Sequence, residues 1–372
     1  MRKYREIDNQ LMAGKVLASG GVIEYYAFQC VDFNEFIVDV ENVTFHDCLF
    51  LGCRFTKSMH YNIDGSNVVL TSLKVPFNVF KTTLYNRDTL YNAYDCNRPE
   101  TLNDTYDSKV YRHYLATGIH ADDINETLAR TLHDHSMSDA LHDFLDGYAE
   151  KDIVAVMGGH ALSRRDKAYR QIVMVSKMLT EHGKLMVSGG GPGAMEATHL
   201  GAWLAGRSND DVDAALSMLE PYESYKEDSW LSSAYNVIEK FPQETYKSLG
   251  IPTWLYGHEP ATPFATHIAK YFENSLREDG LLAIAKGGVI YTPGSAGTMQ
   301  EIFQDAAQNH YRTFGHESPM VFLDSEYWCE KFPIYPLLQG LHQSGGYKNL
   351  LLSLADSPAD AERAIMSFVD GG

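Results

Sequence analysis

Apolar residues in the second half of the chain come in short runs that alternate with longer segments of helical pattern. The runs predict strands over 153–157, 185–188, 253–256, 289–292 and 320–323. The segments between them predict helices over 166–182, 194–205, 265–276, 299–310 and 336–342. Strands that alternate with helices are typical of a parallel sheet covered on both faces. We therefore predict an α/β domain over residues 151–372, built on a doubly wound, Rossmann-like parallel sheet.

The first hundred residues follow another pattern, in which apolar side chains occur in pairs every five positions. The pairs are Val38 with Val40, Val43 with Phe45, Cys48 with Phe50, and Cys53 with Phe55. This spacing resembles the pentapeptide-repeat solenoid, in which each five-residue step forms one side of a square coil. An ordinary twisted sheet with alternating strands fits equally well. On either view residues 1–100 form a smaller β-rich domain, and Cys48 and Cys53 are core residues.

Leucines recur at helical spacing between these two regions. Leu128 and Leu132, and after a polar stretch Leu141 and Leu145, are each four residues apart. We predict a helical connector over residues 101–150. The segment 207–250, inserted between a predicted helix and the next strand, is long for a loop and is either a lid, an oligomer contact or a surface helix pair.

The charge of the chain limits its partners. A formal net charge of −18 would repel duplex nucleic acid, although backbone amides and helix N-termini can still hold a single phosphate. The N-terminus lacks the apolar core of a signal peptide, and no later run is apolar for the roughly 18 residues of a membrane helix. We expect a soluble, cytoplasmic protein that binds neither nucleic acid nor membrane.

The cysteines do not indicate a disulfide framework or a metal centre. The chain has 5 cysteines, an odd number, and they are scattered. Cys48 and Cys53, even with His46 and His60 nearby, fit no common zinc spacing. We expect reduced thiols and no metal.

The loop SGGGPGAM follows a predicted strand and opens a helix, so its bare amides can approach an anion at a positive helix end. The candidate ligand-binding residues here are Gly189, Gly190, Gly191, Gly193 and Met195. The loop also fits a loose GxGxxA dinucleotide fingerprint. That fingerprint is weak alone, and no acidic residue ends a strand about twenty positions later. We therefore expect no cofactor.

The loop PGSAGTMQE is the second glycine-rich strand exit. Together with GGGPGAMEA it resembles the LOG family of nucleotide-binding proteins, whose second signature is PGGxGTxxE. The resemblance covers roughly residues 151–325. It implies a phosphoribohydrolase, which cleaves the N-glycosidic bond of a nucleoside 5′-monophosphate and releases a free base and ribose 5-phosphate. The family's members form dimers or larger assemblies, so the resemblance also implies a homo-oligomer.

The resemblance assigns roles to residues of the second loop. It implies that Gly294, Gly297 and Thr298 bind the phosphate, beside Ser295 and Ala296, and that Glu301 is the catalytic carboxylate. A buried carboxylate beside the ribose would stabilise the positive charge of the transition state. Taken alone, Thr298 and Glu301 also fit a capping box, in which they would only cap the helix.

The sequence departs from the family in two places. Ser295 replaces the second glycine of PGG, and Ala269 with Lys270 stands where the family commonly has adjacent Arg and Lys. If the predicted helix over 265–276 continues, one polar stripe would hold His267, Lys270, Asn274 and Arg277. In that case Arg277 or Lys270 would fix the substrate.

Two further observations leave the function open. His160 and His258 follow predicted strands, and His258 could act as a general acid on the leaving base. The missing arginine and the β-rich N-terminal domain favour the alternative of a non-catalytic nucleotide-binding sensor or regulatory module. An intact Glu301 favours the hydrolase.

Overall fold

The computed structural model describes residues 4–36, 43–60, 63–71 and 73–368. The chain forms two compact units. The first comprises Met1–Leu84 and His113–Phe144, and the second comprises Tyr85–Arg112 and Leu145–Gly372. Among the described residues, no helix combines the length and apolar character needed to cross a membrane.

The first unit stacks short parallel strands. One sheet has the order β1-β3-β5-β6, and a second sheet pairs β2 with β4. The strands are β1 (Arg5–Ile7), β2 (Gly21–Glu24), β3 (Tyr26–Gln29), β4 (Val43–His46), β5 (Leu49–Leu51) and β6 (Val68–Leu70). The helices of this unit are α1 (Gln10–Ala18), α2 (Lys57–His60), the end of α4 (Tyr106–Thr117) and α5 (Ile124–Leu145).

Parallel pairing places aromatic residues of successive strands on top of one another. Phe28 of β3 faces Phe50 of β5 in the register, and their rings stack with centroids 5.3 Å apart and planes 8° apart. Phe33 packs against both rings, and all three side chains are fully buried. The apolar pair Val38 and Val40 lies outside the described residues.

Cys48 and Cys53 belong to the same core. Both are buried, and their thiols donate to the carbonyls of Ile23 and Phe28 over 3.3 and 3.2 Å. Burial raises the pKa of the Cys53 thiol to about 12. The prediction that both cysteines are core residues is confirmed.

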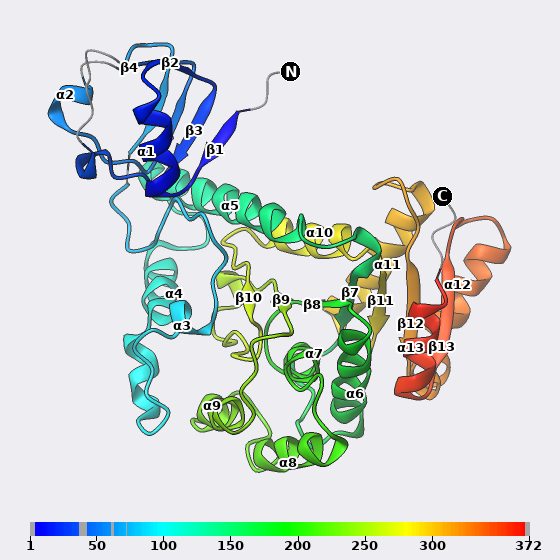
Figure 1. Cartoon of the computed structure of the whole chain (residues 1–372). Coiled ribbons are helices and arrows are strands. Elements are labelled where there is room, and N and C mark those ends of the chain that lie inside the picture. The colour runs from blue at the N-terminus through cyan, green and yellow to red at the C-terminus, as the bar shows by residue number, and fades with distance from the viewer. Residues whose placement is uncertain (1–3, 37–42, 61–62, 72, 369–372) are drawn as a thin grey trace. The chain divides into compact units, whose positions relative to one another are not determined.

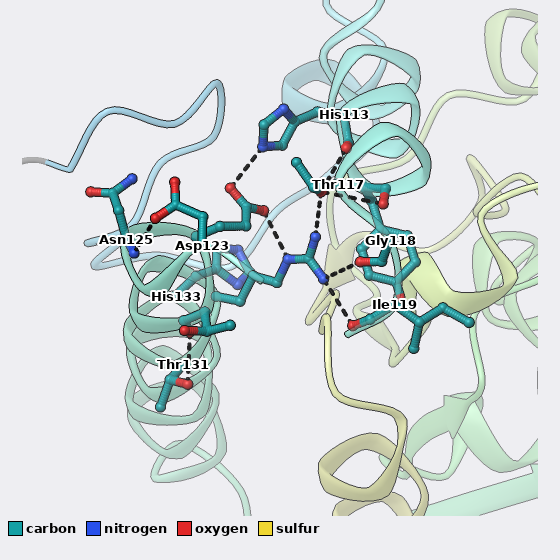
Figure 2. A network of polar contacts seen from close by, with 12 residues as sticks. His113, Thr117, Gly118, Ile119, Asp123, Asn125, Thr131 and His133 are labelled. Atoms are coloured by element: carbon teal, nitrogen blue, oxygen red, sulfur yellow. Dashed lines mark hydrogen bonds and ion pairs between the residues drawn. The ribbon is translucent and has the colours of Figure 1, made fainter. Parts of the chain in front are cut away.

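A polar network joins the end of α4 to α5 (Figure 2). Arg130 donates through Nε to Glu126 over 2.8 Å, and through Nη1 to the carbonyl of Gly118 over 2.9 Å. Its Nη2 donates to the Thr117 hydroxyl over 2.6 Å. The other carboxylate oxygen of Glu126 lies 2.8 Å from Nε2 of His113. These contacts satisfy the buried guanidinium and carboxylate, and they close the turn between the two helices.

The second unit is built on a seven-stranded sheet with the order β10-β9-β8-β7-β11-β12-β13 (Figure 1). Every strand pairs in parallel with its neighbours. The strands are β7 (Ile153–Met157), β8 (Leu185–Ser188), β9 (Ser248–Gly250), β10 (His267–Ile268), β11 (Gly288–Tyr291), β12 (Pro319–Leu323) and β13 (Leu351–Ala355). The predicted α/β class with a parallel sheet is confirmed. The predicted strand at 185–188 is reproduced residue for residue, as is the one at 153–157.

Helices precede, connect and follow these strands. They are α3 (Arg87–Leu90), α6 (Lys167–Glu181), α7 (Ala194–Trp203), α8 (Asn209–Leu219), α9 (Trp230–Lys240), α10 (Asn274–Ile284), α11 (Ala296–Tyr311), α12 (Ile334–Gln343) and α13 (Pro358–Met366). The inserted segment 207–250 supplies α8 and α9, and buried side chains such as Val212 and Val237 join the main hydrophobic core. The segment is therefore a packed helix pair followed by β9.

The predicted strand at 253–256 is wrong. The strand in this region is β9, and residues Trp254–Tyr256 form a single 3-10 turn. Only an isolated parallel bridge between Thr253 and Tyr271 continues the pairing here, with the Tyr271 amide donating to Pro252 and the Trp254 amide donating to Tyr271. The hydroxyl of Thr253 then accepts a hydrogen bond from the Leu255 amide over 3.1 Å and caps the turn.

The predicted helix at 265–276 is also wrong. His267–Ile268 is strand β10, and the helix begins only at Asn274. Ile268 exchanges two backbone hydrogen bonds with Tyr85, at 2.7 and 2.9 Å, and the Ala269 amide donates to Gly250 over 2.9 Å. These distant backbone partners override the local helical pattern. The predicted polar stripe on one helix therefore does not exist.

Candidate functional site

The order of the strands reverses between β7 and β11. The chain proceeds from β7 to β8, β9 and β10 on one side, and then returns to β11, β12 and β13 on the other. Loops that leave the carboxyl ends of neighbouring strands diverge at such a point, and open α/β sheets bind ligands there. A pocket of about 400 Å³ lies at this place in the second unit.

The pocket collects residues from the ends of several strands and from the helices α7, α10 and α11. It is lined by Val156, Met157, Gly158, Gly159, His160, Gly189, Met195, Tyr256, Glu259, Arg277, Glu278, Ser295, Ala296, Gly297, Thr298, Gln300 and Glu301. Eight of these were predicted as site residues from the sequence: Gly189, Met195, Arg277, Ser295, Ala296, Gly297, Thr298 and Glu301. The structure thus brings both glycine-rich loops to one pocket.

The first turn of α11 forms one wall. The helix begins at Ala296 after Ser295, and among the described residues no side chain caps its first amides. The first N–H groups of a helix have no intrahelical acceptor and carry the positive end of the dipole. The capping box considered for Thr298 and Glu301 is wrong, because Thr298 lies inside the first turn and Ser295 holds the cap position.

Arg277 of α10 brings a full positive charge to the pocket. Its Nε donates to the carbonyl of Ile251 over 3.1 Å, and its side chain is only 12% exposed. A Cβ atom built on Gly189 would lie 2.5 Å from Arg277 Nη2. A larger residue at 189 would therefore displace the guanidinium of Arg277 or the sulfur of Met195 from its present position.

Glu301 of α11 lines the pocket beside this arginine. Burial raises the pKa of Glu301 to about 7, the guanidinium of Arg277 lowers it, and the nearby carboxylate of Glu278 raises it further. Glu278 also accepts hydrogen bonds from Asn274 over 2.7 Å and from Gln300 over 3.0 Å. The site therefore places Arg277, the carboxylates of Glu259, Glu278 and Glu301, and helix amides at the same opening.

The other predicted glycines shape the loops. Gly190 and Gly193 have φ angles of 71° and 68°, in the left-handed region that favours glycine. A Cβ on Gly193 would lie 2.5 Å from the carbonyl oxygen of Gly159. The Gly159 amide in turn donates to the carbonyl of Pro293 over 3.2 Å, so backbone contacts hold the three loops together. Gly190, Gly191, Gly193 and Gly294 are not among the lining residues.

Lys270 does not line the pocket. It is fully buried, and its Nζ donates to Oδ1 of Asp107 over 2.6 Å. The same oxygen accepts a hydrogen bond from Nε1 of Trp254 over 2.9 Å. This placement differs from the expectation that Lys270 fixes a ligand, because its ammonium forms a buried ion pair with Asp107. Of the four residues of the expected stripe, Asn274 and Arg277 lie on α10, and Arg277 lines the pocket.

The sequence did not single out several of the lining residues. Gly158 and Gly159 follow β7, Tyr256 ends the 3-10 turn, and Glu259 follows that turn. Their signal was the exit from a predicted strand, MGGH after 153–157 and YGHEP at the end of 253–256, where His160 and His258 were singled out with Glu259 beside them. His160 lines the pocket, whereas the predicted His258 is not among the lining residues and its side chain is 58% exposed.

Comparison with known proteins identifies only solved structures of low similarity. No model of a protein family matches it, and no curated protein matches it. The structure of the molybdenum cofactor binding protein from the phototrophic bacterium Rippkaea orientalis is similar over 58% of this chain and 95% of its own, with 14% identity and a TM-score of 0.37. The molybdenum cofactor carrier protein from Chlamydomonas reinhardtii is similar over 57% of this chain and 95% of its own, with 15% identity and a TM-score of 0.34.

The expected membership of the LOG family is wrong, and with it the expected hydrolysis of nucleotides. No family model supports it, and the similar solved structures are titled as cofactor-binding or carrier proteins instead. The structure also differs where the family commonly places adjacent Arg and Lys. Ala269 and Lys270 follow strand β10 and lie outside any helix, with both side chains buried. The two loop motifs alone were too short to define the family.

Proposed function

We propose that the second unit binds a small organic molecule through a phosphate group, and that its role is to hold or carry this molecule. The observation that carries the proposal is the meeting of the uncapped first turn of α11 with Arg277 in one pocket. Helix N-termini hold anions through amides and dipole, and arginine binds phosphate through two parallel hydrogen bonds. A pocket of about 400 Å³ suits a ligand of nucleotide size.

The net charge of the chain limits where a phosphate can bind. With a net charge of −18 the average surface repels anions, so a phosphate is attracted only where local groups overcome this field. Arg277 supplies such a group, and its Nε is already held by the Ile251 carbonyl. A guanidinium fixed in advance loses little side-chain entropy when a ligand binds.

We further infer that the second unit has a doubly wound, Rossmann-like fold, in which helices cover both faces of the sheet. In that arrangement the crevice at the strand reversal is the expected ligand site. The expected self-association stays a prediction, which sedimentation of the purified protein would test.

Calorimetric titration with ribose 5-phosphate and with ribose tests the proposal, because the two ligands differ only in the phosphate. Ribose 5-phosphate should bind and ribose should not. The Arg277→Ala variant should lose about tenfold or more of the affinity, since a hydrogen bond to a charged group contributes about 1.5–3 kcal/mol. Arg363→Ala removes an arginine whose side chain is 73% exposed on α13, and it should bind like the wild type. Equal binding of both ligands, or of none, would overturn the proposal.

A further inference from the structure

The pocket is lined by a third carboxylate, Glu259, besides Glu278 and Glu301. Its side chain is 17% exposed, and it lines the pocket together with Tyr256 and Met195. A Cβ on Gly191 would lie 3.7 Å from Glu259 Oε2, whereas a Cβ on Gly189 would touch Arg277. Arg277 and Glu259 therefore flank the two ends of the same short glycine stretch.

The carboxylate of Glu259 has few partners for a group that is so far buried. The ring nitrogens of His160 and His258 lie 3.8 and 3.9 Å from its Oε1, beyond hydrogen-bond distance. Within the parts of the chain that the structure describes, neither carboxylate oxygen accepts a hydrogen bond. The side chain is only partly buried and carries a charge, so a ligand that brings N–H groups to it gains affinity through charge-assisted hydrogen bonds.

The two charges also fix the direction of the ligand. A phosphate beside Glu259 would be repelled, whereas at the α11 end it meets the helix amides and Arg277. Of the two carboxylates at that end, Glu278 already accepts hydrogen bonds from Asn274 and Gln300, and burial keeps Glu301 partly protonated near pH 7. The end of the ligand that reaches Glu259 must therefore carry hydrogen-bond donors. A carboxylate accepts two parallel hydrogen bonds most favourably, from two adjacent N–H groups in one plane.

On this basis we propose that the ligand is a phosphorylated heterocycle with two adjacent N–H donors on one edge, as guanine has, and that Glu259 binds this edge. This inference rests on the proposed function, since it takes the phosphate at the other end as given. Tyr256, whose side chain is exposed at 44% in the structure, supplies an aromatic face at the same end of the pocket for the ring.

Titration with GMP, IMP and ribose 5-phosphate tests the inference. IMP lacks the amino group of GMP, so it offers Glu259 one donor in place of two. The wild type should bind GMP about tenfold or more tightly than IMP. Glu259→Gln, which keeps the shape of the side chain and removes its charge, should bring the two affinities together. Glu239→Gln makes the same charge change at an exposed position of α9 and should keep the preference for GMP.

Each result separates the two proposals. Equal affinities for GMP and IMP in the wild type, with ribose 5-phosphate still bound, would overturn the assignment to Glu259 and leave the phosphate site standing. A preference for GMP that survives in Glu259→Gln would also overturn it. If none of the three phosphates binds, the proposed function itself fails. Circular dichroism of each variant shows whether it is folded, and the comparison of GMP with IMP in the wild type needs no variant.

Discussion

The hydroxyl of Tyr291, the last residue of β11, donates a hydrogen bond of 2.6 Å to Oδ2 of Asp305 in the middle of α11. Both side chains are buried. Burial raises the pKa of Asp305 to about 7, and the hydrogen bond from Tyr291 lowers it in part. This carboxyl therefore ties the helix that begins at the pocket to strand β11, which lies beside the central strand β7.

The Asp305 carboxyl should make stability depend on pH. Between about pH 4 and pH 7 the native state keeps the proton on Asp305, whereas the unfolded chain has already released it. The folded state binds more protons in this window, so the free energy of unfolding should fall as pH rises through it. With about 1.4 kcal/mol per pKa unit, the full change should not exceed about 4 kcal/mol. Urea unfolding at pH 5 and pH 8 measures it.

Asp305→Asn is the matched variant, because its side chain has the same shape, accepts the same hydrogen bond and does not titrate. It should flatten the pH dependence of stability over this window. Glu301 has a raised pKa in the same range, so Glu301→Gln removes the second contribution. A wild type whose stability rises between pH 5 and pH 7, with the variant unchanged, would contradict the expectation.

The affinity for a phosphate ligand should fall as pH rises through about 7. Glu301 lines the pocket, its pKa is raised to about 7, and its charged form repels the ligand. Calorimetric titration of ribose 5-phosphate between pH 6 and pH 8, with wild type and Glu301→Gln side by side, measures this fall. The phosphate ionises in the same range and affects both proteins alike, so the informative quantity is the difference. Identical pH profiles would show that Glu301 does not face the phosphate.

Two glycines at the pocket should respond differently to an added methyl group. A Cβ on Gly158 would lie 1.9 Å from Thr292 Oγ1 and 2.8 Å from Ala194 Cβ, whereas a Cβ on Gly297 meets nothing within 4 Å. Gly158→Ala should therefore lose about 1–3 kcal/mol of stability through overpacking. Gly297→Ala, in the first turn of α11, should be neutral or gain up to about 1 kcal/mol. Thermal and urea unfolding of both variants gives the comparison, and a loss in Gly297→Ala as large as in Gly158→Ala would contradict it.

The sequence predicted those parts of the fold in which local pattern and tertiary pairing agree. The strands β7 and β8 are continuous apolar runs, as buried parallel strands require, and their bounds were predicted correctly. Both glycine-rich loops were predicted as ligand-binding loops because the sequence shows a strand pattern, a run of glycines and a helix pattern in succession. Since parallel strands end at one edge of the sheet, the meeting of the loops could be inferred without coordinates.

The segment from 253 to 276 could not be predicted because its partners are distant in sequence. The pairing of Ile268 with Tyr85 places a strand where the local pattern favours a helix. Arg277 was expected beside Lys270 on one helical stripe, yet it reaches the pocket because α10 begins at Asn274. Asp305, whose polar side chain alone favours a solvent-exposed position, is buried because its face of α11 meets the sheet. In each case a contact between remote residues decides the outcome.

Lys270 should matter for stability and not for ligand binding. Its ion pair with Asp107 is buried, and the ammonium also lies 5.3 Å from the ring centroid of Trp254. Lys270→Met leaves the Asp107 carboxylate without its cation, and breaking a buried pair in this way costs about 3–5 kcal/mol. Urea unfolding of the variant should show this loss.

The double variant Lys270→Met with Asp107→Leu should recover part of the lost stability, because it leaves no unpaired charge inside the unit. At temperatures where Lys270→Met is folded, it should bind ribose 5-phosphate like the wild type, in contrast to Arg277→Ala. Lys270 and Arg277 both carry positive charge and were expected at the same site. Comparing Lys270→Met with Arg277→Ala therefore distinguishes a cation that lines the pocket from one that forms an ion pair in the core. A loss of phosphate affinity in Lys270→Met without a loss of stability would place Lys270 at the ligand after all.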